Sequence, residues 1–510
     1  MIEHTYVYTE RVESPARQVP EGKRLPFGWQ AFAVPPTNEG KPAKMHLAKE
    51  PESAASVTGP VYLRITVALD VREEKRVEAR LASSGRIIGS FRIRYAYLFQ
   101  PFQLELSLEE AELARQEGIE LRMTEGHEPL WVFFEQHAAS PSTLFVPHLL
   151  YGYGESEQEI DKAEQFLKRF LSLDSVQEFS WMGGCVWDGL WAISKRKSIV
   201  CPAGPTPREV LERQLGLFFD ESMRLVYENP RSEPVDGMIN GIECTLPFAV
   251  IAKLWPDHPT LDVALSFWKE HTQEDGVIQD GDTLSAEGSY TVAYPIAVLA
   301  RQRRDEKLAE LARKQLLLRR DRLPIDNDLY LRYTQKNGQV TRTFRNWARA
   351  FAWYMLGLAH TLTELEGLVE QNKLVAAGQA NRADQAATEM AELREEFRRI
   401  ADIALKHQLP DGLWANFLDE PSVEADTSGS AGIAAALVMG VGQGWLQSEA
   451  REAAERTYDA LLQRLTPDGL LPGVAQSNRG GEALQRSDYR VLSQMGMGLL
   501  AQLYAALAKS

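Results

Sequence analysis

The sequence predicts a mainly α-helical protein with two domains, a β-sandwich-like domain over residues 1–150 and a helical domain over residues 155–510. Two observations lead to this expectation. Short runs of β-branched and aromatic residues fill the first part of the chain, whereas segments with helical spacing and cap residues fill the rest. The glycine-rich stretch YGYGESEQ at 151–158 lies where the pattern changes and marks the expected boundary.

The first 150 residues contain four clear strand-like runs, VYLRITVALDV, GRIIGSFRIRYAYLF, IELRMT and PLWVFFEQ. Their alternation of apolar and polar residues favours antiparallel strands packed as a sandwich. None of the runs carries a recognisable binding motif. The sequence therefore leaves open whether this domain has a structural, a dimer-forming or a sugar-binding role.

The remaining chain is expected to form helices that alternate between two kinds. Segments such as EKLAELARKQLLLRR are charged on one face and suit an outer layer, whereas SGSAGIAAALVMGVG is apolar nearly all round and suits a buried one. Turns EDGVI, PDGLWA and PDGLLP each follow a charged helix and precede an apolar one, as in repeated helix pairs. The pattern predicts an (α/α)6 toroid. Its twelve helices are expected at 159–173, 184–197, 207–226, 238–255, 260–272, 285–302, 305–320, 346–366, 383–408, 427–445, 448–465 and 489–508.

In such a toroid the six inner helices run the same way, so their N-termini meet at one mouth. Acids, one arginine and aromatic residues are expected there, a combination that suits a sugar pocket. The candidates are Asp188, Asp236, Asp282, Trp347 with Arg349, Asp426 with Thr427 and Ser428, and Asp488. The alternative is that each acid or hydroxyl only caps its helix, which stabilises a helix by about 1 kcal/mol.

The segment RTFRNWARAFAW at 342–353 carries the sharper signal. Arg342, Arg345 and Arg349 crowd the start of a helix, where the helix dipole disfavours cations. A carboxylate ligand would reverse that balance, because both the helix N-terminus and arginine bind one well. Trp347 and Trp353 could offer flat faces to a sugar ring, with ordinary core packing as the alternative.

The stretch GVIQDGDTLSAEGSY at 276–290 groups Asp280, Asp282 and Glu287 around glycines. A calcium loop is one interpretation, but the glycine and the final glutamate fall at the wrong offsets for a helix-loop-helix site. The favoured interpretation places Asp282 at the mouth, with Asp280 as a turn residue and Glu287 as support one turn into the helix.

Composition excludes several function classes. A formal net charge of −15 over 510 residues argues against nucleic-acid phosphates or an anionic membrane as partners. Cys185, Cys201 and Cys244 lie at wide, irregular spacing, so neither zinc nor a disulfide framework is expected. No cofactor or metal is predicted. The start MIEHTYVYTERVESP lacks the features of a signal peptide, and a cytoplasmic location is expected.

Three motifs together resemble the unsaturated glucuronyl and rhamnogalacturonyl hydrolases, glycoside hydrolase families 88 and 105. WARAFAW at 347–353 is similar to the family's W-A-R-G-x-G-W, and DTLS at 282–285 to its D-x-L-x-M segment. DGLWANFLDEPSVEADTSGSA at 411–431 is similar to its D-G-L-W-x-x-x-L-D-x-P motif, followed by an acid and a small-residue helix start. The resemblance covers about 155–508, and the N-terminal β-domain has no counterpart in the simplest members.

The resemblance implies a glycosidase that removes a terminal, 4,5-unsaturated uronic acid from acidic oligosaccharides. It places the two catalytic aspartates on Asp236 and Asp282, with Asp282 as acid and base. It matches Trp347 and Trp353 to the tryptophans of the substrate platform, and Arg349 to the arginine near the carboxylate. Further substrate-binding residues are predicted at the mouth, namely Arg345, Asp426, Thr427, Ser428, Asp188, Glu287 and Arg332.

Two departures from the family pattern keep other functions open. Ala350 and Ala352 replace two helix glycines, and Arg332 in NDLYLRY stands where a histidine is common. The alternatives are an exo-acting glucuronidase on saturated glucuronides, a lyase on a similar toroid, and a non-catalytic carbohydrate-binding protein. The sequence does not decide the oligomeric state, and a homodimer is one expectation.

Overall fold

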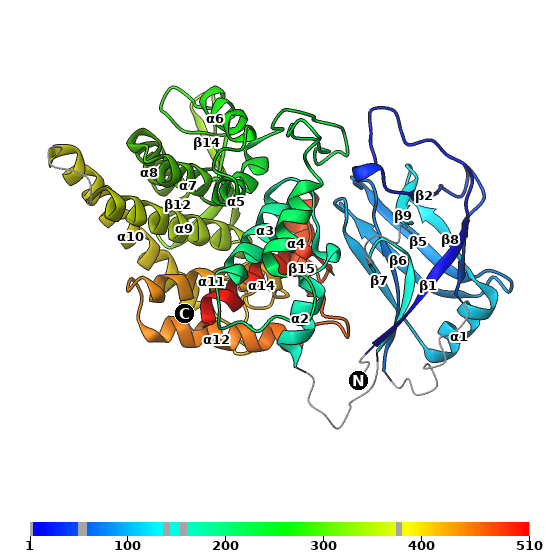
Figure 1. The fold of residues 1–510 in the computed structure, drawn as a ribbon. Helices are drawn as coiled ribbons and strands as arrows, with labels where there is room; N and C mark the ends of the chain where they lie inside the picture. The colour runs from blue at the N-terminus through cyan, green and yellow to red at the C-terminus, as the bar shows by residue number, and fades with distance from the viewer. Residues whose placement is uncertain (1–3, 49–58, 136–142, 153–160, 374–379, 509–510) are drawn as a thin grey trace.

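The computed structural model describes residues 4–48, 59–135, 143–152, 161–373 and 380–508. A β-sheet part built from the first third of the chain lies beside a larger helical part (Figure 1). This order of strands followed by helices confirms the coarse expectation, although the protein is more mixed than a mainly α-helical chain. The last strand of the first part ends at Gly152 and the next helix begins at Lys162, so most of the predicted boundary stretch lies outside the described residues.

Antiparallel strands form the N-terminal part. Its main sheet has eight strands in the order β6-β5-β8-β3-β1-β10-β4-β7. In chain order the strands are β1 (His4–Glu13), β3 (Ala43–Leu47), β4 (Val61–Thr66), β5 (Glu74–Leu81), β6 (Ile87–Arg94), β7 (Pro101–Leu106), β8 (Ile119–Glu125) and β10 (His148–Gly152). A second pair joins β2 (Ala31–Val34) to β9 (Leu130–Phe133), and one helix, α1 (Leu108–Glu117), follows β7.

Strand β1 belongs to two groups of strands. Its first half pairs with β10 and its second half with β3, and the register shifts between Thr9 and Arg11. Such an irregularity bends a strand, which lets the sheet fold over on itself. The two edge strands β6 and β7 consequently contact each other. A Cβ at Gly89 of β6 would lie 2.5 Å from the Leu104 side chain of β7.

The helical part contains the twelve predicted helices, within a few residues of the expected bounds at most ends. The buried series is α3 (Trp181–Ser194), α5 (Pro247–Leu254), α7 (Tyr294–Arg303, after a π-helical turn at Ser289–Ala293), α9 (Ala348–Lys373), α11 (Thr427–Gly442) and α14 (Gln494–Leu507). The outer series is α2 (Lys162–Phe170), α4 (Pro207–Gly216), α6 (Thr260–Glu270), α8 (Glu306–Arg322), α10 (Ala380–Lys406) and α12 (Ser448–Gln463). Within the described ranges, no helix is long and apolar enough to cross a membrane.

The six helices of the buried series contact one another in a ring. Each contacts the next in chain order, and α14 returns to contact α3. Burial follows this division, since α11 is buried almost throughout its length, whereas α12 buries a stripe that includes Ala450, Ala453, Ala454 and Thr457. Such a stripe repeats at helical spacing and faces the core.

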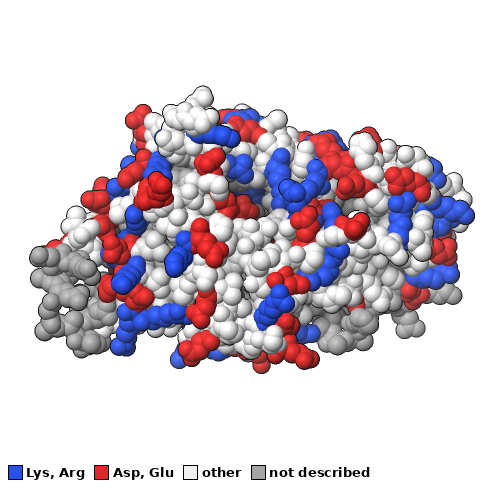
Figure 2. Space-filling view, turned by 90° about the horizontal axis from the view of Figure 1, so that it is seen from above, with Lys and Arg blue, Asp and Glu red and all other residues white. Residues whose placement is uncertain are grey.

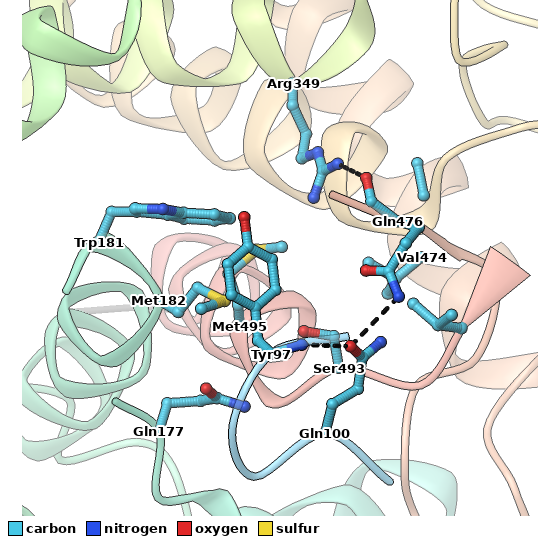
Figure 3. A pocket seen from close by; sticks show the side chains of 12 residues that line it. Tyr97, Gln100, Gln177, Trp181, Met182, Arg349, Val474, Gln476, Ser493 and Met495 are labelled. Carbon is cyan, nitrogen blue, oxygen red and sulfur yellow. Dashed lines mark hydrogen bonds between the residues drawn. The ribbon is translucent and has the colours of Figure 1, made fainter. Parts of the chain in front are cut away.

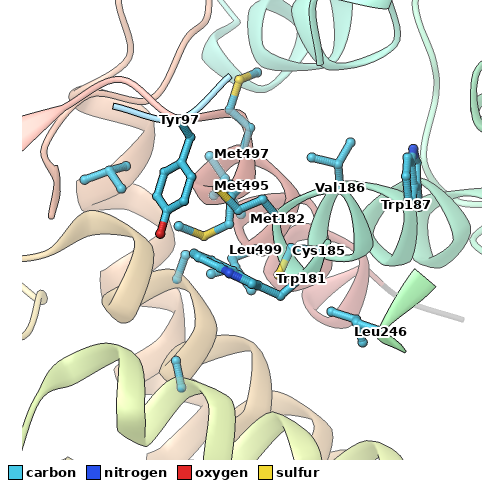
Figure 4. Packing of buried hydrophobic residues seen from close by; sticks show 14 of the residues in the cluster. Tyr97, Trp181, Met182, Cys185, Val186, Trp187, Leu246, Met495, Met497 and Leu499 are labelled. Atoms are coloured by element: carbon cyan, nitrogen blue, oxygen red, sulfur yellow. The ribbon is translucent and has the colours of Figure 1, made fainter. Parts of the chain in front are cut away.

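Close helix contacts depend on small residues. A Cβ at Gly432 of α11 would lie 2.7 Å from the Cβ of Ala352 on α9. The alanine that departs from the family pattern therefore packs against a glycine in the neighbouring helix. At the contact between α3 and α14, the side chains of Trp181, Met182 and Met495 pack together with Tyr97 from the N-terminal part (Figure 4).

Helix starts at the same end of the ring contact one another. The Gln177 amide, just before α3, donates a hydrogen bond to Gln494 at the start of α14 (2.8 Å). Arg349 at the start of α9 lies beside Asp426, which precedes α11, with 3.7 Å between Nε and Oδ2. These contacts join the start of α3 to that of α14 and the start of α9 to that of α11, and we call this end of the ring the mouth.

A small sheet interrupts the helical series and was not predicted. It contains β11 (Thr283–Ser285), β12 (Pro324–Ile325), β13 (Asp328–Lys336) and β14 (Gln339–Arg345). The expectation that a helix starts at residue 285 is wrong, because Ser285 belongs to β11, which pairs with β13, and helical backbone begins at Glu287 before it passes into the π-helical turn at Ser289. A further pair joins β15 (Val474–Ala475) to β16 (Arg490–Val491), with the short helix α13 (Gly481–Arg486) between them.

A buried ion network joins the two parts of the chain. The carboxylate of Asp468 accepts hydrogen bonds from Arg64 of β4 (2.5 and 3.2 Å) and from Arg169 of α2 (2.6 Å). The hydroxyl of Tyr6 on β1 also donates to it (3.0 Å). The side chains of Arg64 and Asp468 are fully buried. The β-sheet part is thus held against the helices by charges withdrawn from water.

Candidate active site

Arg349 and Asp426 form one unit at the mouth. One Asp426 oxygen caps α11, because it accepts hydrogen bonds from the Ser428 amide (3.0 Å) and hydroxyl (2.7 Å), and it also accepts from the Ala475 amide (3.0 Å). The other oxygen faces Arg349 Nε at 3.7 Å, and both of these atoms are buried without a hydrogen-bond partner among the described residues. The hydroxyl of Thr427 donates to the Pro472 carbonyl (2.8 Å). Asp426 therefore caps α11 with one oxygen and faces the charge of Arg349 with the other.

The two predicted tryptophans are nearly fully buried. The Arg349 guanidinium lies 4.6 Å from the centre of the Trp347 ring, and the Trp347 indole donates to Gln485 (3.2 Å). Trp353 packs edge-on against Trp181 at 5.3 Å. At 2% and 1% exposure, Trp347 and Trp353 present no open ring face, and core packing describes both. Their role as a sugar platform stays a prediction.

Glu287 lies between β11 and the π-helical turn, and only 6% of its surface is exposed. Burial raises the pKa of its carboxyl to about 8, and the nearby Glu243 carboxylate adds to the rise, while Arg332 and Arg349 oppose it. Arg332 of β13 pairs in register with Ser285, two residues before Glu287. The carboxyl is thus buried, with two arginines close by.

Glu243 stands in the turn Ile242–Thr245 that precedes α5. Burial raises the pKa of its carboxyl, Asp280 raises it further, and Arg479 and Arg332 lower it. Asp280 itself accepts a hydrogen bond from the Ile242 amide (3.2 Å), which ties the two helix starts together. Glu243 and Glu287 are therefore neighbouring acids, and two such groups resist ionising together.

Glu178 precedes α3 and is a third acid at this end of the ring. Only 2% of its surface is exposed, and neither carboxylate oxygen has a well-formed hydrogen-bond partner among the described residues. Burial raises its pKa to about 8, whereas Arg479 lowers it. The Arg479 guanidinium lies 4.7 Å from the ring centre of Tyr97. The buried carboxyls of Glu178 and Glu287 and the partly buried Glu243 thus share the mouth with Arg332, Arg349 and Arg479.

The two predicted catalytic aspartates differ from these acids in burial and in partners. Asp282 lies in an exposed turn before β11, and no hydrogen bond or ion pair holds its carboxylate within the described ranges. Arg24 of the N-terminal part donates hydrogen bonds to both carboxylate oxygens of Asp236 (2.7 and 2.8 Å). These hydrogen bonds lower the pKa of Asp236, which keeps it ionised. The catalytic roles of both remain predictions.

Two other predicted residues occupy different places from those expected. Asp188 lies in the middle of α3 and not at its start, and it accepts hydrogen bonds from the hydroxyls of Tyr290 (2.6 Å) and Tyr294 (2.8 Å). It therefore belongs to the polar interior of the ring. Arg345 lies on the surface, with 48% of its side chain exposed, and pairs with Asp328 and Asp419.

Beside Arg349 lies a narrow cavity, lined by Trp181, Gln476 and, from the N-terminal part, Tyr97 and Gln100 (Figure 3). The free space of about 10 Å³ suffices for roughly one water molecule. No cluster of three or more metal-ligating side chains occurs among the residues described, and these include the stretch 276–290, for which a calcium loop was the alternative interpretation.

Sequence reasoning missed Glu178, Glu243 and Arg479. A usable signal was present for one of them, because Glu243 is an acid within the apolar run GIECTLPFAV. A charge in a buried helix start is rare unless it has a function or a partner. Glu178 and Arg479 stand in irregular segments, and only the folded chain brings them together.

A comparison with family models gave a match to the C-terminal part of the chain. Residues 288–509 match glycosyl hydrolase family 88. The protein is a glycoside hydrolase. The match confirms the resemblance expected from the motifs, since WARAFAW and DGLWANFLDEP lie inside it. The match starts one residue after Glu287, so Glu178, Glu243 and Glu287 lie outside the matched range.

Solved structures are similar to this hydrolase in fold. A possible GH105 family member from Salmonella enterica has a TM-score of 0.53 at 13% identity, over 69% of this chain and 96% of the other. One from Klebsiella pneumoniae has a TM-score of 0.53 at 15% identity, over 69% and 95%. A family 105 glycoside hydrolase from C. acetobutylicum has a TM-score of 0.52 at 18% identity, over 68% and 98%. A comparison with curated proteins found no match.

Proposed function

We propose that this hydrolase releases a terminal 4,5-unsaturated uronic acid from acidic oligosaccharides. The observation that carries the proposal is the group of Arg332, Arg349 and Arg479 among buried carboxyls at the mouth. Because the chain as a whole is acidic, an anionic sugar needs such a local basic cluster. Elsewhere the charges are mixed, since basic and acidic side chains are interspersed over the face seen in Figure 2.

The two helix series are proposed to form an (α/α)6 toroid, with the buried helices as its inner ring. This arrangement supports an exo-acting enzyme, because the ring interior is filled by side chains such as Asp188, Tyr290 and Tyr294. An oligosaccharide therefore enters the mouth by one end of its chain and cannot pass through the ring. A terminal sugar would meet the carboxyls, and the rest of the oligosaccharide would extend into solvent.

Glu287 is proposed as the proton donor, with Glu243 as the neighbouring acid. The raised pKa of Glu287 supports this role, because a general acid at neutral pH must keep its proton until the substrate takes it. Glu243 shares the dry site and disfavours the loss of that proton. Arg349 is proposed to bind the uronic carboxylate, with its guanidinium held between Trp347 and Asp426.

The proposed reaction is a hydration of the sugar double bond. Glu287 gives a proton to C4, and the resulting carboxylate takes a proton from a water molecule whose oxygen bonds to C5. The hydrated sugar is a hemiketal, which opens and breaks the glycosidic link. This differs from displacement by two carboxylates, so the separation of the carboxyls does not predict the stereochemistry.

The substrate class can be tested with matched substrates. On an unsaturated disaccharide, the ultraviolet absorbance of the C4=C5 bond is expected to disappear as the sugar is released. A saturated glucuronide with the same second sugar is the control and is expected to remain intact. Persistence of the absorbance while the saturated substrate is cleaved would identify a conventional glucuronidase. Rising absorbance on intact polymer would indicate a lyase, and binding without turnover a carbohydrate-binding protein.

The pH dependence of activity follows from the proposed proton donor. As pH rises through about 8, Glu287 loses its proton, and kcat/KM is expected to fall. The folded protein holds this proton at pH values where an exposed glutamate has lost it, so stability also decreases from pH 4.5 toward pH 8. Rates from pH 5 to 10, with thermal unfolding at each pH, separate the two effects. An alkaline limb near the ordinary carboxyl pKa would exclude Glu287 as the donor.

A further inference from the structure

The segment Tyr95–Gln100, between β6 and β7 of the N-terminal part, reaches the mouth of the helical part. Tyr97 and Gln100 line the cavity beside Arg349 (Figure 3). The Phe99 carbonyl accepts a hydrogen bond from Gln494 at the start of α14 (2.9 Å). The segment therefore contacts the helices at the same end of the ring as the buried carboxyls.

A chain of hydrogen bonds runs from this segment to Arg349. The Gln100 side-chain oxygen accepts from the backbone amide of Tyr97 (3.1 Å) and from the side-chain amide of Gln476 (3.2 Å). The backbone carbonyl of Gln476 in turn accepts a hydrogen bond from the Arg349 guanidinium. Gln100 thus fixes the residue that orients Arg349. Both Gln100 and Gln476 are 3% exposed, so water does not substitute freely for either partner.

Tyr97 is fixed from three sides. Its hydroxyl shares a hydrogen bond with Ser477 (2.9 Å), and its ring packs edge-on against Trp181 at 6.3 Å. Arg479 lies over the ring. Each of these partners belongs to the helical part, and Ser477 follows Gln476 directly. Gln100 and Tyr97 therefore contact the same short segment, residues 476–479.

The backbone of the segment is held in an uncommon conformation. Tyr95 has φ +49° and Phe99 has φ +65°, values that non-glycine residues rarely adopt. Such conformations persist where surrounding contacts outweigh their cost, and they concentrate at functional sites. Here the contacts are the hydrogen bonds to Gln476, Ser477 and Gln494. The two residues with this strained backbone, Tyr95 and Phe99, lie on either side of Tyr97.

We propose that the N-terminal part completes the substrate site, with Gln100 as a positioning residue that holds Arg349, through Gln476, for the carboxylate of the uronic acid. The inference rests on the proposed function for the identity of the ligand. It makes the β-sheet part necessary for recognition of the acid group, beyond any role in stability. Tyr97 holds the segment against the helical part, because its ring packs between Trp181 and Arg479.

The test compares Gln100→Ala with the wild-type full chain in direct binding, so that turnover is not required. Isothermal titration with glucuronate and with its methyl ester measures the contribution of the carboxylate. Gln100→Ala is expected to weaken glucuronate binding about tenfold and to leave the ester unchanged, because only the acid depends on Arg349. With a cleavable uronide, KM is expected to rise while kcat stays within about threefold.

Tyr489→Phe is the matched control, because its hydroxyl bonds the backbone of Arg92 (2.7 Å) at another contact between the two parts. It is expected to bind both ligands as the wild type does. If Gln100→Ala does not fold, Gln476→Ala removes the other partner of the same hydrogen bond.

Two outcomes overturn the inference. One is unchanged glucuronate affinity in Gln100→Ala, and the other is an equal loss for acid and ester. If the wild type binds glucuronate better than the ester but cleaves no unsaturated disaccharide, the proposed reaction fails and the role of Gln100 is still decided by binding.

Discussion

Glu287→Gln is expected to lower kcat on an unsaturated uronide about a thousandfold, within the usual range for a lost general acid. The amide keeps the size of the side chain but cannot deliver a proton. The substitution also removes a buried carboxyl whose pKa is raised to about 8, so the free energy of unfolding at pH 8 should not decrease. Single-turnover rates with the two proteins at pH 6 measure the effect on chemistry.

Asp282→Asn is the matched comparison, since it changes an acid to its amide five residues earlier in the chain. Its carboxylate is exposed, and kcat is expected to stay within about threefold of wild type. The resemblance to families 88 and 105 predicts the reverse order, with Asp282 as the acid. Loss of turnover in Asp282→Asn, with activity retained in Glu287→Gln, would favour that assignment and refute the one based on burial.

The helical architecture was predictable because the information is local. Each charged helix such as α12 has an apolar stripe, and each buried helix such as α11 is apolar all round, so the sequence of both kinds could be followed along the chain. The same logic located Arg349 and Asp426, which stand at helix starts. Their separation of 3.7 Å came only from the folding of α9 against α11.

The small sheet before α9 also has a local sequence signal, although it stands among helices. The residues of β13 and β14 alternate in character and are joined by Asn337 and Gly338, with φ of +51° and +77°. Asn-Gly is the strongest short sequence signal for a hairpin turn, so this hairpin was predictable from the sequence. The motif alone makes Arg332 a replacement for a histidine, whereas the pairing of β13 places it opposite Ser285, two residues before the buried Glu287.

The acids of the site were the least predictable part. Turn acids beside glycine, such as Asp236 and Asp282, attract attention in a sequence because a ligand could approach them. Burial, however, depends on which segments cover a residue, and Glu178 is covered by segments hundreds of residues away, including the one that contains Arg479. A sequence pattern therefore finds exposed carboxylates more readily than the buried ones whose pKa values suit acid catalysis.

Asp468→Asn is expected to lower the free energy of unfolding by about 3–5 kcal/mol, the usual result of breaking a buried ion pair from one side. The substitution leaves Arg64 fully buried without its carboxylate, and leaves Arg169 with Asp174 alone. The two arginines hold the pKa of Asp468 well below its usual range, so the wild-type network is intact at neutral pH and is lost only in strong acid. Because Arg64 belongs to β4 and Asp468 to the helical part, the loss should separate the two parts.

Urea unfolding at pH 7, followed by tryptophan fluorescence, measures this loss. Asp262→Asn is the control, since its ion pair with Arg303 is exposed and is worth less than about 1 kcal/mol. Equal stability of the two variants would show that the network contributes nothing specific. A variant whose helical part stays folded while the β-sheet part opens would also lose the contact of Gln100 with Gln476. Weaker glucuronate binding in that state would connect the stability of the interface to recognition of the substrate.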